Sequence, residues 1–201
     1  KEYLTKHQRI IFNGNGYSHE WLAEAERRGL PNIKSMVEAV ETLTTDKAVK
    51  LFEKFGIFTK AELESREEIL YETYAKTINI EALTMINMAS KQILPAVIKY
   101  TKTLADTVVA VREAGAAADV QADLLKEAST LLEEAKKALE VLKREDTKAA
   151  SMPQGKEQAF YYKDAVKEAM TALRTPIDAL EMIVDKGAWP LPAYGDLMFE
   201  V

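Results

Sequence analysis

The sequence predicts an all-α chain, and three features of the residue pattern support this class. Between Thr59 and Glu113 there is no glycine and only one proline, Pro95, so this stretch is almost free of helix breakers. Two later stretches repeat apolar residues at alternating spacings of four and three, which is the period of one face of a helix. Arg9–Phe12 is the only strand-like run.

Short helices are predicted for the first part of the chain. The strand-like run ends at the tetrapeptide Asn13 to Gly16, which is typical of a turn because Asn and Gly tolerate positive φ. Ser18 is placed to cap a helix from about His19 to Arg28, and Gly29 follows as a stop signal.

Two capping boxes mark further helix starts. Ser35 is followed by Glu38, and Thr59 by Glu62, the spacing at which a hydroxyl and a carboxylate satisfy each other's backbone N–H groups. Thr45 is expected to begin another short helix between them.

The remainder is predicted to form long helices. The first runs from Thr59 to about Glu113, and Pro95 should kink or split it because proline lacks a backbone donor. Ala114 to Ala116 is the expected connection. Asp119 is then predicted to cap a helix that extends to about Arg144.

Each of the last two long helices carries one apolar seam. The stretch Asp146–Gly155 between them is predicted to be a loop, and the last helix to run from about Glu157 to Lys186 with a kink at Pro176. The first seam consists of Leu124, Ala128, Leu131, Ala135, Ala138 and Leu142. The second consists of Tyr162, Val166, Ala169, Leu173, Pro176, Leu180 and Ile183.

These elements predict short N-terminal helices with one brief strand-like segment, followed by an antiparallel bundle of long helices. An extended tail is expected from about residue 188, because Pro190 and Pro192 fix φ and lack donors. The tail is also rich in apolar residues, such as Trp189 and Phe199, and these need a surface on which to pack.

Composition narrows the classes of function. The 201 residues include 27 Lys and Arg and 32 Asp and Glu, and the two signs of charge are interspersed along the chain. Because no large basic face results, neither nucleic acid nor an anionic membrane is an expected partner. No apolar run approaches the roughly 20 residues that span a bilayer. The absence of cysteine excludes disulfides and cysteine nucleophiles and fits a cytoplasmic protein. Because Lys1 is not Met and begins no signal peptide, we expect the chain to be part of a longer protein.

No catalytic, cofactor-binding or metal-ligating residue is predicted. The two histidines, His7 and His19, lie outside the long helices and do not supply the Glu-x-x-His pairs of a di-iron bundle. Asn13 to Gly16 lacks the spacing of a phosphate-binding loop. Paired acids such as Glu67-Glu68 and Glu133-Glu134 stand among lysines and are expected to face solvent.

Several stretches together are distinctive: Arg9–Ser18, Glu20-Trp21, Glu24–Leu30, Leu51–Phe55 and Trp189–Tyr194. They resemble the carboxy-terminal part of type III glutamine synthetases. The resemblance covers nearly the whole chain, although the helices between the first and last stretches would fit many bundles.

The resemblance implies a parent enzyme, in a homo-oligomer, that ligates ammonia to glutamate with ATP and Mg²⁺. It implies that residues 1–58 close the catalytic domain and that residues 59–201 form a helical extension. In that family the metal-binding glutamates and the substrate-binding arginines precede the part matched here. The segment itself is therefore expected to be inactive and to bind no cofactor, and its partners are the rest of the catalytic domain and neighbouring subunits.

Two alternatives remain open at this point. One is a stand-alone helical interaction or sensor module, because sensor bundles have the same seam pattern. The other is a helical metal oxidase, which the two histidines disfavour. Whether Asn13 to Ser18 lines the active site of the parent enzyme or only turns the chain is also open.

Overall fold

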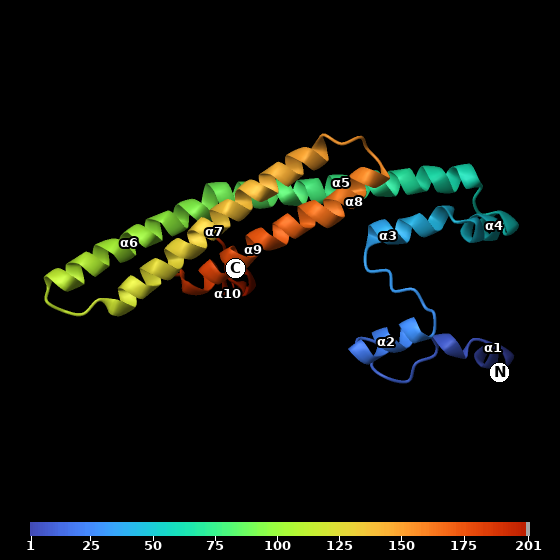
Figure 1. The fold of residues 1–201 in the computed structure, drawn as a ribbon, viewed down its shortest axis with the longest axis horizontal. Coiled ribbons are helices and arrows are strands. Elements are labelled where there is room, and N and C mark those ends of the chain that lie inside the picture. The colour runs from blue at the N-terminus through green and yellow to red at the C-terminus, as the bar shows by residue number, and fades with distance from the viewer. Residues whose placement is uncertain (200–201) are drawn as a thin grey trace. The chain divides into compact units, whose positions relative to one another are not determined.

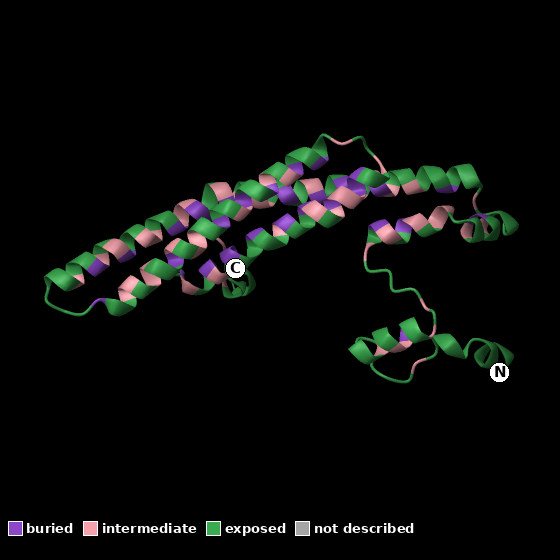
Figure 2. Cartoon of the chain, viewed as in Figure 1, coloured by how far each residue is buried: buried purple, intermediate pink, exposed green. Residues whose placement is uncertain are grey.

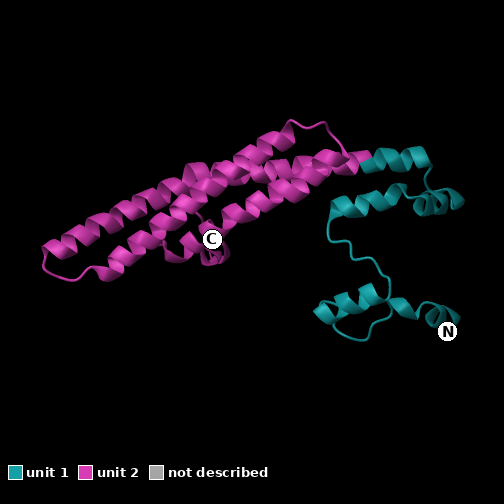
Figure 3. Cartoon of the chain, in the orientation of Figure 1, with its two compact units in different colours: residues 1–67 teal, residues 68–201 magenta. Residues whose placement is uncertain are grey.

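The computed structural model describes residues 1–199 and divides the chain into two compact units (Figure 3). Unit 1 is Lys1–Glu67, and unit 2 starts at Glu68. The division falls inside one helix, α5 (Lys60–Met88), close to its start. The described residues contain no strand, and the predicted all-α class is confirmed.

Unit 1 is a series of short helices (Figure 1). They are α1 (Glu2–Lys6), the 3₁₀ helix η1 (Gln8–Ile10), α2 (His19–Arg27), α3 (Met36–Val40), the 3₁₀ helix η2 (Glu41–Thr44), α4 (Asp46–Lys54) and the beginning of α5. Most of these helices start at a hydroxyl side chain that accepts a hydrogen bond from a backbone N–H. The accepting residues are Ser18, Ser35, Thr45 and Thr59, as the sequence predicts.

The strand-like prediction for Arg9–Phe12 is wrong. Gln8–Ile10 forms η1, and Ile11, with φ −93° and ψ 122°, is extended but lies in no ladder. A strand requires a partner strand to satisfy its backbone groups. Within residues 1–199 no strand is present to pair with this segment, and the Arg28 side chain donates a hydrogen bond to the carbonyl of Ile11 instead.

Unit 2 is built from long helices and two π-helical turns (Figure 1). The elements after α5 are the π turn η3 (Ala89–Ile93), α6 (Leu94–Glu113), α7 (Asp119–Ala150), α8 (Lys156–Tyr161), the π turn η4 (Tyr162–Val166), α9 (Lys167–Ile183) and α10 (Tyr194–Phe199). The chain reverses between α6 and α7, where Gly115 adopts a positive φ of 78°, so these two helices pack antiparallel. α9 also packs along α7.

Pro95 interrupts the first long helix, as predicted. It is the second residue of α6, the helix that directly follows η3, and α5 and α6 meet there at an angle (Figure 1). Proline lacks the N–H that would bond to the carbonyl four residues earlier, and its ring crowds that carbonyl. The wider π turn accommodates the missing hydrogen bond.

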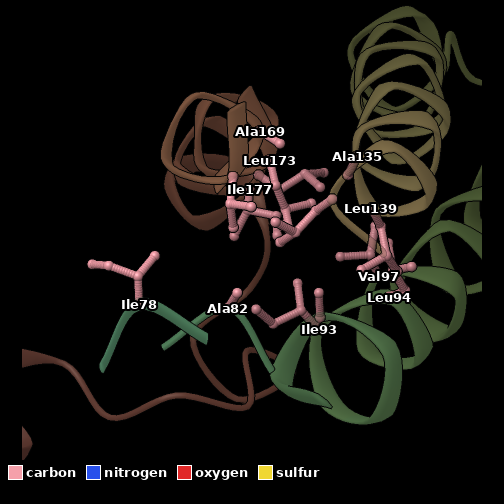
Figure 4. Packing of buried hydrophobic residues seen from close by; sticks show 14 of the residues in the cluster. Ile78, Ala82, Ile93, Leu94, Val97, Ala135, Leu139, Ala169, Leu173 and Ile177 are labelled. Atoms are coloured by element: carbon pink, nitrogen blue, oxygen red, sulfur yellow. The ribbon is translucent and has the colours of Figure 1, made fainter. Parts of the chain in front are cut away.

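The core of unit 2 lies along the predicted seams. Leu142, Val166, Leu173 and Leu180 are each fully buried, and Figure 4 shows residues of α7 and α9 facing those of α5 and α6. Figure 2 shows buried residues recurring along the inner sides of these helices. Burial of this apolar surface, at roughly 25 cal/mol per Å², is the main force that holds the long helices together.

Both predicted boundaries of α7 are wrong. Asp119 is the first residue of α7 rather than its cap, and its neighbour Ala118 precedes the helix without a side-chain hydrogen bond. α7 continues past Arg144 to Ala150, so the predicted loop is reduced to the segment after Ala150. The added turns are stabilised by tertiary packing, since Asp146 and Ala149 are both buried.

The tail is only partly extended. Ile183 ends α9, earlier than the predicted Lys186, and Trp189 and Leu191 pack against the core as the tail's apolar composition predicts. The segment Tyr194–Phe199 then forms α10 rather than an extended chain, and none of its residues is buried. Residues 200–201, which complete the predicted tail, lie outside the described residues.

Candidate functional site

The loop from Asn13 to Ser18 is a hydrogen-bonded turn in unit 1. The Asn15 side-chain carbonyl accepts the N–H of Tyr17 at 3.0 Å, and the Asn15 main-chain carbonyl accepts the hydroxyl of Ser18 at 2.8 Å. Ser18 in turn accepts the N–H of Trp21, which starts α2. This geometry leaves the ring of Tyr17 fully exposed at the tip of the turn.

Arg28 connects the segment before this turn to α2. Its Nη1 donates to the carbonyl of Ile11 at 2.7 Å and to that of Arg9 at 3.2 Å. Its Nε donates to the Glu24 carboxylate at 2.5 Å, and its guanidinium lies 5.6 Å from the ring centre of Trp21. The Arg28 side chain therefore holds the segment before the turn, Arg9 to Ile11, against α2.

Aromatic packing and charge reinforce this arrangement. The rings of Phe12 and Trp21 stack with centroids 4.5 Å apart. A Cβ on Gly14 would lie 2.6 Å from the Phe12 ring, so any larger residue there would displace this ring. Hydrogen bonds from Arg27 and Arg28 lower the pKa of Glu24 to about 2, so the carboxylate stays ionised until strongly acidic pH.

Unit 1 buries little of its apolar surface. Only five of its hydrophobic residues are buried: Ala25, Val37, Val40, Val49 and Leu63. Eleven large ones are exposed: Tyr3, Leu4, Ile10, Ile11, Tyr17, Leu22, Ile33, Met36, Leu51, Phe55 and Ile57. Figure 2 shows this preponderance of exposed residues along the short helices. So much exposed apolar side chain in so short a segment is typical of an interaction surface.

Unit 2 contains an apolar groove of about 580 Å³ between α5 and α9. Methionines and aliphatic side chains line it, and one of them, Met85, also packs against the core. Charged side chains stand at its rim, where Arg174 pairs with Asp178 at 3.0 Å. The lining residues are Ile80, Glu81, Thr84, Met85, Met88, Ile93, Met170, Leu173, Arg174, Ile177, Asp178, Glu181 and Leu191.

A second hollow in unit 2 is polar, and we call it the polar hollow. It has a volume of about 150 Å³ and lies where α5 faces the end of α7 and the start of the last helical segment. Its lining residues are Glu72, Ala75, Lys76, Asn79, Ala150, Gln154, Gln158 and Tyr162.

A buried carboxylate, Asp146, stands behind this hollow. It is 5% exposed, and its Oδ1 accepts a hydrogen bond from Asn79 Nδ2 at 3.1 Å. Burial raises the pKa of Asp146, and the hydrogen bond from Asn79 opposes that rise. Burial also raises the pKa of Tyr162, with a contribution from the Asp146 charge. The three side chains form one hydrogen-bonded group between α5, α7 and η4.

The sequence predicted neither hollow, although one signal pointed to the second. Asp146 lies on the same face of α7 as the apolar seam, four residues after Leu142 and three before Ala149. A polar residue at a seam position is buried, and a buried carboxylate requires a partner. The partner, Asn79, lies 67 residues away and could not be identified from the sequence.

The remaining side chains considered from the sequence lie on the surface. Glu133 pairs with Lys137 at 3.9 Å, and both are more than three-quarters exposed. His7 and His19 are exposed in unit 1. An exception is Tyr162 of the second predicted seam, which is buried, and its neighbour Tyr161 packs at the edge of the core. Within residues 1–199, no three His, Asp or Glu side chains are grouped closely enough to hold a metal ion. None of the helices described here is long and apolar enough to cross a membrane.

Comparison with known proteins places these features in context. A family model described as glutamine synthetase C-terminal domain matches residues 1–112, which span unit 1, α5 and nearly all of α6. Glutamine synthetase of Butyrivibrio fibrisolvens is 37% identical over 203 residues, and type-3 glutamine synthetase of Dictyostelium discoideum is 32% identical over 209 residues. Glutamine synthetase of Bacteroides fragilis is also 32% identical.

These alignments cover 99–100% of this chain but only 28–29% of each relative. The chain therefore spans less than a third of the length of the curated relatives it matches.

Proposed function

Because this chain belongs to the glutamine synthetase C-terminal domain family, we propose that it is the non-catalytic C-terminal helical region of an enzyme that ligates ammonia to glutamate. Its work in that enzyme is structural: unit 1 supports the catalytic domain and unit 2 contacts neighbouring subunits of a cytoplasmic homo-oligomer. ATP and Mg²⁺ are used by the parent enzyme and bound outside this segment.

One observation carries the proposal, namely the surface of unit 1. Its exposed apolar side chains outnumber its buried ones, although its helix starts are well formed. Leu51 and Phe55, 52% and 64% exposed, stand four residues apart on one face of α4, and Ile57 follows them. A second surface that covers this face would supply the core that unit 1 lacks.

The chemistry of the reaction supports the same assignment. Phosphoryl transfer to a carboxylate needs cations and donors that converge on the phosphate oxygens. Several lysines and arginines of the long helices instead pair with acids on their own helix, as Lys102 does with Asp106 and Lys136 with Glu140. Such exposed pairs at i,i+4 stabilise a helix surface.

The length of the relatives agrees with this division of labour. Each is a glutamine synthetase of which this chain matches less than a third, so most of the parent enzyme lies outside the matched part. We assign the ligand-binding carboxylates and arginines to that larger part.

The test uses the full-length protein that contains this chain. Leu51→Ser together with Phe55→Ser should lower γ-glutamyl ligase activity and shift the assembly to smaller species in analytical ultracentrifugation. Lys50→Ser, an exposed polar neighbour on α4, is the matched control and should change neither. Full activity and unchanged assembly in the double variant would contradict docking through α4.

A second measurement addresses the non-catalytic role. The 201-residue chain alone is assayed for ATP- and glutamate-dependent γ-glutamyl transfer with Mg²⁺ present. No turnover is expected, and robust turnover would refute the proposal.

A further inference from the structure

The apolar groove of unit 2 has an acidic rim. Methionine and aliphatic side chains, most of them from α5 and α9, form its walls. Glu81, Asp178 and Glu181 stand at the rim, and all three are exposed. One guanidinium, that of Arg174, opposes these three carboxylates, and it pairs with Asp178. The net charge beside the groove is therefore negative, which favours a partner with apolar side chains and cations next to them.

One face of α4 has the complementary character. Leu51, Phe55 and Ile57 are 52%, 64% and 55% exposed, and we call these three residues the α4 face. Lys47 lies one turn before Leu51 and Lys54 three residues after it, so both lysines stand on the same side of the helix as Leu51. The two acids of α4 precede Leu51 by five residues and follow it by two, spacings that place them on the opposite side. The α4 face thus combines apolar side chains with positive charge.

The groove and α4 also match in length. The α5 wall of the groove extends from Ile80 to Met88, roughly 12 Å, and the α9 wall from Met170 to Glu181, roughly 16 Å. The nine residues of α4 are roughly 13 Å long. A cavity of about 150 Å³ holds a benzene molecule, so a groove of about 580 Å³ has room for the three side chains of the α4 face together.

The reach of the chain indicates that a second copy supplies this helix. α5 is continuous from Lys60 to Met88, so Ile80, at the near end of the groove, lies roughly 30 Å along the helix from Lys60. Phe55 precedes Lys60 by five residues, which span at most about 18 Å when fully extended. A chain of this length is too short to bring Phe55 to the groove of its own copy, whereas a neighbouring copy is not limited in this way.

We propose that the α4 face of one copy of this chain docks in the apolar groove of a second copy, with Lys47 and Lys54 beside the acids of the rim. This inference rests on the proposed function, in which unit 2 contacts neighbouring subunits, and it names the surface that covers α4. The two surfaces differ, so the contact is heterologous: each copy donates one α4 face and accepts another. Contacts of this kind generate rings of subunits where the rotation between copies closes.

A mixing experiment tests the pairing. The chain contains no cysteine, so one variant receives a single thiol next to the α4 face, Ala48→Cys, and another receives one in the groove, Thr84→Cys. A short bismaleimide added to the mixture should join the two variants into a covalent dimer on a denaturing gel, and neither variant alone should form it. Thr103→Cys on α6 is the matched control, because the Thr103 and Thr84 hydroxyls both donate to the carbonyl four residues earlier. Equal products with Thr84→Cys and Thr103→Cys, or no product with Thr84→Cys, would overturn the proposal.

Charge reversal tests the complementarity. Glu81→Lys together with Glu181→Lys should weaken self-association of the chain at least about tenfold in analytical ultracentrifugation, because lysines would then face lysines. Lys47→Glu together with Lys54→Glu should weaken it to a similar extent. The chain that carries all four substitutions restores opposite charges across the contact and should recover most of the association.

The control for charge reversal is Glu127→Lys together with Glu134→Lys. These exposed acids lie on α7 outside the groove, and their reversal changes the net charge by the same amount and should leave association unchanged. A loss as large as that of the groove variant, or no recovery in the fourfold variant, would show that the contact is not the one proposed. Circular dichroism verifies that each variant is folded.

These results are separable from the tests of the proposed function. If the α4 double variant of the full-length protein loses activity and assembly but no cross-link to the groove forms, docking of α4 stands and its pairing with the groove fails. If the cross-link forms but the isolated chain shows turnover, the contact stands and the non-catalytic role fails.

Discussion

Units 1 and 2 stabilise their helices in different ways. The short helices α2, α3 and α4 of unit 1 begin at side-chain caps, whereas α7 and α8 of unit 2 have no side-chain hydrogen bond at their starts. Unit 2 instead holds a continuous buried cluster that extends from Ala75 to Val184. A helix of one or two turns cannot bury enough surface to offset its nucleation cost, so it depends on local hydrogen bonds, while a long amphipathic helix depends on its neighbours.

The sharpest way to break this contrast is to truncate a core residue. Leu173→Ala in α9 removes a fully buried side chain that packs in the main cluster, and it should lower the free energy of unfolding by about 2–5 kcal/mol. Urea denaturation followed by circular dichroism measures the change. Leu51→Ala, with a half-exposed side chain in unit 1, is the control and should cost less than about 0.5 kcal/mol. Equal losses would show that the units do not differ in packing.

Removal of a cap tests unit 1. Thr59→Ala removes the Oγ1 that accepts the Glu62 N–H at 3.4 Å and donates to the Glu62 carboxylate at 2.8 Å, while the backbone N–H at position 59 can still donate to Glu62. A loss of about 0.5–2 kcal/mol is expected and should appear as faster amide exchange in the first turn of α5. Asp119→Ala in the first turn of α7 serves as the comparison and should have the smaller effect. If both starts respond alike, the distinction between capped and packed helices fails.

A substitution at the bend between α5 and α6 is expected to increase the stability of the chain. The hydroxyl of Ser90 is buried within η3 and has no hydrogen-bond partner. Ser90→Ala should therefore raise the free energy of unfolding by about 0.5–1 kcal/mol, because it removes an unsatisfied group and improves helix propensity. Thermal unfolding of the two proteins side by side measures this. A loss of stability would mean that the hydroxyl is bonded after all.

The smallest effect is a dependence on pH at Asp146. Because the pKa of this carboxyl is raised in the folded chain, its ionised form opposes folding at neutral pH. This penalty fades as the pH falls through the folded pKa, and it is gone below the unfolded pKa. Asp146→Asn should thus stabilise the chain at pH 7 and lose that advantage towards pH 4. Melting temperatures across this range, with exposed Asp123→Asn as control, provide the test. A benefit that is constant with pH would exclude ionisation as its cause.

The sequence determined the parts of this protein that depend on neighbours in the chain. Hydroxyl caps at Ser18, Ser35 and Thr59 fixed where short helices begin, since a cap acts over three residues. The alternating spacing of apolar residues predicted the all-α class and the buried seams of α7 and α9. Pro95 itself predicted the interruption of the first long helix.

Only the tertiary structure decided where the long helices end and where polar groups gather. The last turns of α7 looked like a loop in sequence, yet Ala149 is fully buried there and Asp146 meets Asn79 from α5. The polar hollow likewise arises where distant segments meet. Local helix propensities contribute tenths of a kcal/mol per residue, whereas burial of one large apolar side chain contributes about 1.5–3 kcal/mol. Contacts between segments far apart in the chain therefore outweigh the preferences of the local sequence at these positions.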